Sequence, residues 1–95
     1  MSIVDLDPVI HSRIRLAVMS ALAGLESTDF NDLKKITGAS DGNLSTHLSR
    51  LETAGYIKLK KGYRGKRPLT TCRITPAGRT AFERYLDQLK ANLSL

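Results

Sequence analysis

The first long stretch of the chain shows apolar residues at helical spacing. Asp7 and Pro8 suit a helix cap and the first helical position, and Gly24 is a common kind of helix end. The pattern therefore predicts a helix over residues 8–24 that is apolar on more than one side, as in helices that bury two surfaces. Its main stripe holds Ile14, Ala17, Val18, Ala21, Leu22 and Leu25, and the apolar residues off that stripe include Val9, Leu16, Met19 and Ala23.

Two shorter helices are expected next. Residues 30–37 carry an apolar stripe that ends at Gly38, and Ser40 is a suitable cap for a helix over residues 41–54, which Gly55 ends. Residues 27–29, between the first two helices, are short enough for a small strand or a turn. The buried side of the third helix is predicted to hold Leu44, Leu48 and Leu51, spaced i, i+4 and i+7.

The pattern then changes from helical to alternating. Ile57 and Leu59 alternate with Lys58 and Lys60, which predicts a strand that begins at Tyr56. The remaining elements are a turn-rich loop over residues 62–68, a second strand over residues 69–74 and a last helix over residues 76–93 that Thr75 caps. So short a connection allows the two strands to pair only antiparallel.

These elements predict one small domain over residues 1–95. The expected fold class is mainly α with a small β-hairpin (α+β), in the order α-(β)-α-α-β-β-α. A chain of 95 residues buries a limited share of its surface, and Cys72 is its single cysteine, so no disulfide within the chain can add stability. A partner subunit is the expected extra source of stability.

The charge of the chain is concentrated in the hairpin. From Thr53 to Phe82 there are eight basic residues and no acidic one, within a chain of net charge +6 and pI about 9.8. This balance favours a polyanionic partner, nucleic acid first. An anionic membrane is the competing partner. The longest uncharged stretch, residues 16–25, is too short to span a bilayer, and the acidic start does not resemble a signal peptide, so we expect a cytoplasmic protein without a membrane partner.

The outer face of the predicted third helix carries short polar side chains. Serine and threonine can donate to or accept from base edges, asparagine suits adenine, and arginine suits guanine in bidentate fashion. A face that is only solvated more often carries Glu and Lys at i, i+4 spacing. An ordinary polar surface helix is the alternative interpretation. The residues expected to contact base edges in double-stranded DNA are Asn43, Ser45, Thr46, Ser49 and Arg50.

Three blocks of the sequence together resemble winged-helix transcriptional regulators of the MarR/ArsR type, in particular their small stand-alone group. The blocks are LDPVIHSRIRLAVMSAL, FNDLKKITGASDGNLSTHLSRLETAGYI and KKGYRGKRPLTTCRITPAGR. The resemblance implies a helix-turn-helix made of residues 30–37 and 41–54, with the second helix in the major groove. It also implies a wing over residues 62–69 on the minor groove or backbone, and a homodimer on a pseudo-palindromic site.

The charges of the hairpin agree with a wing that contacts phosphates. Lysine and arginine side chains at phosphates release counterions, so affinity falls as salt rises. A solvated basic loop is the alternative interpretation, which the absence of acidic residues disfavours. The residues expected at the DNA backbone are His47, Lys60, Lys61, Arg64, Lys66 and Arg67.

Surplus apolar residues on the terminal helices predict a two-fold dimer interface. The last helix carries a seam of nearly three turns, which is long for so small a core and consists of Phe82, Leu86, Leu89 and Leu93. Helices 8–24 and 76–93 are expected to form the interface, through Val9, Leu16, Tyr85, Leu86, Leu89 and Leu93.

Several other activities lack support in the sequence. His11, His47 and Cys72 lie on three separate elements and do not form a metal-ligand pattern. No phosphate-binding loop, dinucleotide turn or nucleophile motif is present, so we expect neither an enzyme nor a cofactor. No group of residues in the sequence has the pattern of a binding site for a small effector molecule, so the sequence predicts no particular effector.

The favoured hypothesis is a dimeric, sequence-specific regulator that binds double-stranded DNA. The alternative is a winged-helix protein-interaction module whose basic hairpin binds an acidic partner. A binder of single strands or RNA is a third hypothesis. It is weakened because Tyr56 and Tyr63 are the only aromatic residues near the hairpin, whereas stacking surfaces use several.

Overall fold

The computed structural model describes residues 5–93 of the chain. The predicted α+β class and the order of its elements are confirmed. The elements are α1 (Arg13–Leu25), β1 (Ser27–Asp29), α2 (Phe30–Thr37), α3 (Asp41–Thr53), β2 (Ile57–Arg64), β3 (Arg67–Ile74) and α4 (Pro76–Asn92).

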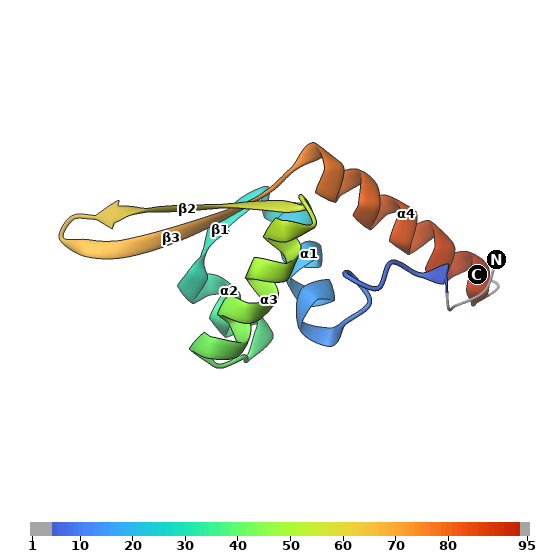
Figure 1. Ribbon diagram of the computed structural model, residues 1–95, viewed down its shortest axis with the longest axis horizontal. Coiled ribbons are helices and arrows are strands. Elements are labelled where there is room, and N and C mark those ends of the chain that lie inside the picture. The colour runs from blue at the N-terminus through green and yellow to red at the C-terminus, as the bar shows by residue number, and fades with distance from the viewer. Residues whose placement is uncertain (1–4, 94–95) are drawn as a thin grey trace.

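The three strands form one antiparallel sheet in the order β1-β3-β2. The short segment after α1 is therefore a strand, which pairs Ser27 with Arg73 and Asp29 with Thr71. The molecule is elongated, with principal extents of 50 × 25 × 21 Å. The β2–β3 hairpin projects from one end of the helical body, and α4 extends from the other (Figure 1).

The first helix begins later than its sequence suggests. It starts at Arg13 rather than at residue 8, and its cap is Ser12, whose hydroxyl accepts from the backbone N–H of Arg15. Asp7 instead caps a turn, because its carboxylate accepts from the Val9 N–H at 2.8 Å. The other oxygen of that carboxylate accepts from the Tyr56 hydroxyl, and burial together with this bond raises the pKa of Tyr56 to about 12. The Asp-Pro pair thus forms a turn that connects the N-terminal segment to the start of β2.

The end of α1 also differs from the prediction. Gly24 lies inside the helix, and the chain leaves the helix at Glu26, which adopts φ = +67°. The Glu26 N–H donates to Leu22 O at 2.8 Å, while its carbonyl accepts from the Ile74 N–H at 3.0 Å. Because β1 begins at the next residue, the chain turns within one position, and the contact with β3 holds this uncommon conformation.

The wing is mostly strand rather than loop. The predicted loop over residues 62–68 is instead paired as far as Arg64 and Arg67. Only Gly65 and Lys66 connect the two strands, and Gly65 has φ = +63°. Glycine with positive φ at the first central position is typical of a two-residue hairpin turn. The hairpin is therefore a longer and more regular arm than its composition suggests.

The core confirms the buried side predicted for the third helix. Leu44, Leu48 and Leu51 are each at most 2% exposed. The N-terminal segment before α1 also contributes to this core through Leu6 and Ile10, although it belongs to no helix or strand of regular length. α1 supplies Ile14, Val18, Met19 and Leu22, and the sheet supplies Ile57, Cys72 and Ile74.

The start of α4 is fixed against the start of β2. The Thr75 N–H donates to Tyr56 O at 3.0 Å, and the Thr75 hydroxyl donates to Gly55 O at 2.6 Å. Gly78, in the first turn of α4, packs against the backbone of Tyr56. A Cβ at position 78 would come 2.0 Å from the Tyr56 carbonyl oxygen. The absence of a side chain at residue 78 therefore sets how closely α4 approaches the hairpin.

Candidate nucleic-acid interface

The outer face of α3 is open to solvent. Its predicted base-contacting residues, Asn43, Ser45, Thr46, Ser49 and Arg50, are all exposed. Ser40 caps the helix through a 3.2 Å bond from the Asn43 N–H, and Thr46 donates to Gly42 O within the helix at 3.0 Å. The side chains opposite the leucine stripe are thus short, polar and accessible, which a helix that enters a groove requires.

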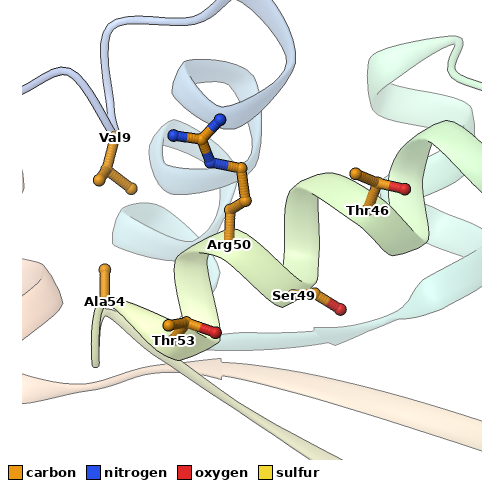
Figure 2. A pocket seen from close by; sticks show the side chains of 6 residues that line it. All are labelled: Val9, Thr46, Ser49, Arg50, Thr53 and Ala54. Carbon is orange, nitrogen blue, oxygen red and sulfur yellow. The ribbon is translucent and has the colours of Figure 1, made fainter.

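A shallow pocket lies beside the C-terminal half of α3. The N-terminal segment forms one wall through Val9, and α3 forms the rest (Figure 2). The Arg50 side chain extends from the helix on the side of Val9. The hydroxyls of Ser49 and Thr53 point away from Val9. The full lining is Val9, Thr46, Ser49, Arg50, Thr53 and Ala54.

A second groove separates α3 from the hairpin. Ser45 and Ser49 line it from α3, and Lys61 and Thr70 line it from β2 and β3. Glu52 also lines this groove, and its carboxylate accepts from the Leu59 N–H at 3.1 Å. β2 is an edge strand of the sheet, so this bond connects α3 to the outer side of the hairpin. The sequence analysis did not single out Glu52, because nothing in its spacing reveals a backbone partner seven residues away.

The basic residues of the hairpin are exposed but do not share one face. Lys61 lines the groove beside α3, whereas the alternation of side chains places Lys60 on the opposite face of the hairpin. Arg64, Lys66 and Arg67 lie at its far end and line a pocket with Asn31 of α2. The structure therefore places Lys61 in the groove beside α3, Lys60 on the other face of the hairpin and the remaining three at the tip.

Arg64 has a partner within the protein. Its guanidinium lies 3.7 Å from a carboxylate oxygen of Asp29. The other oxygen of Asp29 accepts from the Asp32 N–H at 2.9 Å and caps α2. This ion pair connects the end of β2 to the start of α2, so a phosphate at the tip would compete with Asp29 for Arg64.

His47 contacts a buried arginine that sequence analysis missed. Arg15 is 7% exposed, and its Nη1 lies 2.7 Å from His47 Nδ1. Its Nε donates to the Val9 carbonyl. The available signal was an arginine inside the apolar stretch of the first helix, next to Ile14 and before Val18.

The residues predicted at a dimer interface have different surroundings. Tyr85 is 1% exposed and belongs to the core of its own chain, where its hydroxyl and His11 Nδ1 form a 2.8 Å hydrogen bond. Burial raises the pKa of Tyr85. Leu86 and Leu93 are exposed, at 37% and 54%. The half-buried residues of the set are Val9, Leu16 and Leu89.

Cys72 faces the core, and burial raises the pKa of its thiol to about 12. It is therefore a poor nucleophile and a poor metal ligand at neutral pH. Within residues 5–93, no group of three His, Cys, Asp or Glu side chains is placed to hold a metal ion. The helices of this part of the chain include none that is long and apolar enough to cross a membrane.

Comparison with known proteins adds three findings. The model of a family described as a winged helix DNA-binding domain matches residues 14–93. The uncharacterized protein MJ0432 of Methanocaldococcus jannaschii is 37% identical over 81 residues, which cover 85% of this chain and 88% of that protein. A transcriptional regulator homologue from Pyrococcus horikoshii OT3 has a solved structure that is 30% identical, with a TM-score of 0.84, over 90% of this chain and 85% of that one.

A more distant structure shares the fold alone. It is a MarR-family transcriptional regulator from Silicibacter pomeroyi, 19% identical, with a TM-score of 0.69 over 90% of this chain and 56% of that chain.

Proposed function

We propose that this chain, which belongs to the winged helix DNA-binding domain family, is a cytoplasmic, dimeric regulator that binds specific sequences of double-stranded DNA. In this proposal α3 enters the major groove, and the hairpin lies on the minor groove or the backbone. Base edges are contacted by Asn43, Ser45, Thr46, Ser49 and Arg50. The backbone is contacted by His47, Lys61, Arg64, Lys66 and Arg67, and by Lys60 only where the backbone passes the opposite face of the hairpin.

One observation carries the proposal. The exposed polar face of α3 and the acid-free hairpin border the same groove, in which Ser45 and Ser49 face Lys61 and Thr70. Hydrogen-bonding groups on a helix suit base edges, and cations on an adjacent arm suit phosphates. The Glu52–Leu59 bond supports a fixed angle between these two parts. A duplex can thus be contacted by both at once.

Arg50→Ala tests the assignment of α3 as the recognition helix. We expect the variant to lose about 1–3 kcal/mol on the preferred duplex and to accept all bases at one position, because an arginine that pairs with guanine specifies that base. Selection of bound duplexes from a random library, carried out on wild type and variant, measures both effects.

Thr53→Ala is the matched control, since Thr53 lines the same pocket one turn further along α3 and is outside the proposed base-contacting set. It should select the wild-type sequence. Equal weakening of Arg50→Ala on every duplex would instead make Arg50 a phosphate contact.

The dimer belongs to the proposal and rests on α1 and α4. Leu86 of α4 and Leu93 at its C-terminal end lie seven residues apart and are more exposed than the other proposed interface residues. Leu89 of α4 and Leu16 of α1 are half-buried. Apolar side chains on a helix that extends away from the body favour association with a second copy. Such a dimer would place two α3 helices in successive major grooves, ~34–36 Å apart.

Leu86→Lys combined with Leu93→Lys should abolish this association. Each change occurs twice in a two-fold dimer, and a buried leucine contributes roughly 1.5–3 kcal/mol, so we expect at least about a hundredfold weaker dimerisation. Sedimentation at micromolar concentration measures the effect. Leu25→Lys, which changes a leucine that is 58% exposed at the end of α1 and outside the proposed interface set, should remain dimeric. A wild-type chain that sediments only as a monomer, with native circular dichroism, would contradict the dimer.

A further inference from the structure

The buried arginine of α1 has an unusual set of partners. Arg15 is 7% exposed, and its guanidinium donates to two neutral acceptors, the Val9 carbonyl and His47 Nδ1. Neither of the ion pairs Lys34–Asp41 and Arg64–Asp29 includes Arg15, and the charged group that acts on the pKa of Arg15 is another cation, Arg50. Buried charges are normally paired with an opposite charge, so an arginine that donates to neutral acceptors indicates a role other than simple stabilisation.

The contact with Arg15 fixes the protonation of His47. A guanidinium has donors only, so the Nδ1 atom at 2.7 Å must be the acceptor and carry no proton. The ring is therefore neutral, with its single proton on Nε2. Nε2 has no hydrogen-bond partner among the residues that the structure describes, and His47 is partly exposed. The ring thus offers one N–H donor on the side away from α1.

The charges around His47 also favour its neutral form. The charged groups that face it are Arg15 from α1 and Arg50 from α3, and the N-terminal segment contributes the Val9 carbonyl behind Arg15. Burial first, and then these two cations, lower the pKa of His47. Burial and the charge of Arg50 lower the pKa of Arg15 as well. Protonation of His47 would break its bond with Arg15 and place a third cation between the other two.

We propose that Arg15 is a positioning residue for DNA binding, which holds His47 as the neutral Nε2–H tautomer and directs that N–H to a DNA phosphate. The inference rests on the proposed function. His47 flanks the base-contacting face of α3, and the flank of a helix in the major groove lies beside the backbone. An ordinary histidine at a phosphate takes up a proton on binding, so its affinity rises as pH falls through its pKa. With Arg15 in place this site binds phosphate without that proton uptake near neutral pH.

Two substitutions at residue 47 test whether the His47 Nε2–H donates to a phosphate. In His47→Gln, the amide oxygen can accept from Arg15 while its NH2 donates outward, so both roles are kept. Binding to the selected duplex at pH 8 should stay within about twofold of wild type. His47→Leu keeps a good helix former but loses both roles, and we expect about tenfold weaker binding. If His47→Leu binds as tightly as wild type, the inference is wrong and His47 is not a backbone contact, while duplex binding by α3 and the hairpin still stands.

Arg15→Met tests the positioning. Two-dimensional NMR of the imidazole nitrogens should show the Nε2–H tautomer in the free wild-type protein, with a midpoint below the usual value near 6.5. In Arg15→Met the midpoint should move up towards that value, and duplex affinity should then rise several-fold between pH 8 and pH 6, a change absent from wild type and from the double variant Arg15→Met/His47→Gln. An unchanged tautomer and midpoint in Arg15→Met would overturn the inference.

Arg79→Met is the matched control. Arg79 donates to the Ala23 carbonyl at 3.2 Å, so this variant also removes an arginine that contacts backbone, but it should leave the His47 titration and the pH profile at their wild-type values. If Arg15→Met does not fold, the comparison of His47→Gln with His47→Leu, together with the wild-type tautomer, decides the inference. If no variant and no wild type binds any duplex, the proposed function fails and the inference fails with it.

Discussion

Gly78→Ala is expected to destabilise the protein by about 3 kcal/mol or more, which is large against a total of ~5–15 kcal/mol for a domain. A Cβ at residue 78 would lie 2.0 Å from the Tyr56 carbonyl oxygen, and the two nearest further atoms are also backbone. Backbone cannot rotate away as a side chain can, so α4 must shift from the start of β2. The two bonds from Thr75 to Tyr56 and Gly55 would be strained by that shift.

Thermal unfolding followed by circular dichroism measures this effect. A loss of that size lowers Tm by roughly 12 °C or more in a domain of this length. Gly24→Ala is the matched control, because Gly24 lies inside α1 with no atom within 4 Å of a new Cβ. It should stabilise the protein by roughly 0.5–1 kcal/mol through helix propensity. A Tm for Gly78→Ala within a few degrees of wild type would show that α4 is not held against β2 as described.

The second large effect is expected from the triple variant Arg64→Ala/Lys66→Ala/Arg67→Ala. Each phosphate contact contributes about −0.9 to the slope of log affinity against log salt, so loss of all three should make the slope less steep by roughly 2.7. Over a fourfold change in salt this is a difference of about 40-fold in affinity. Arg64 should contribute least, because its pairing with Asp29 at 3.7 Å must first be broken.

Fluorescence anisotropy with a random-sequence duplex, titrated across salt, measures the slopes. The control variant replaces Arg13, Arg84 and Lys90 by alanine, which are exposed residues of α1 and α4. Both triple variants lower the net charge from +6 by three, so a difference between them reports position rather than total charge. Equal salt slopes in the two variants would show that the residues of the hairpin tip do not contact phosphates.

The parts of the fold with strong local signals were predictable from sequence. Ser40 caps α3 and Thr75 caps α4 as expected, and the leucines of α3 are buried. The winged-helix part of the resemblance is confirmed by the family match, and the MarR-family regulator from Silicibacter pomeroyi shares the fold. These features depend on residues within a few positions of one another, which a sequence displays directly.

The features that sequence analysis missed depend on distant partners. Asp7 and Pro8 have the form of a helix start, but the Tyr56 hydroxyl, 49 residues away, donates a hydrogen bond to the Asp7 carboxylate in a turn. Gly62 and Pro68 disfavour strands and therefore predict a loop, whereas pairing along β2 and β3 overrides that local preference.

The pairing of Arg15 with His47 is another distant contact. It joins residues 32 positions apart, and neither residue type alone indicates the other. The sequence predicts His47 as a contact of the DNA backbone, but it does not reveal that Arg15 of α1 forms a hydrogen bond with it. Buried polar contacts between helices of this kind become visible only when the packing of the helices is known.

The central claim is that the polar face of α3 and the basic hairpin together bind duplex DNA. Anisotropy of the wild-type protein with a labelled random duplex, competed by the same strands unpaired and by poly-glutamate, tests it most directly. We expect binding at low salt that weakens steeply as salt rises, and displacement by unlabelled duplex at much lower concentration than by single strands or poly-glutamate. No binding to duplex at low salt, or equal displacement by poly-glutamate, would contradict the claim and favour an acidic protein partner.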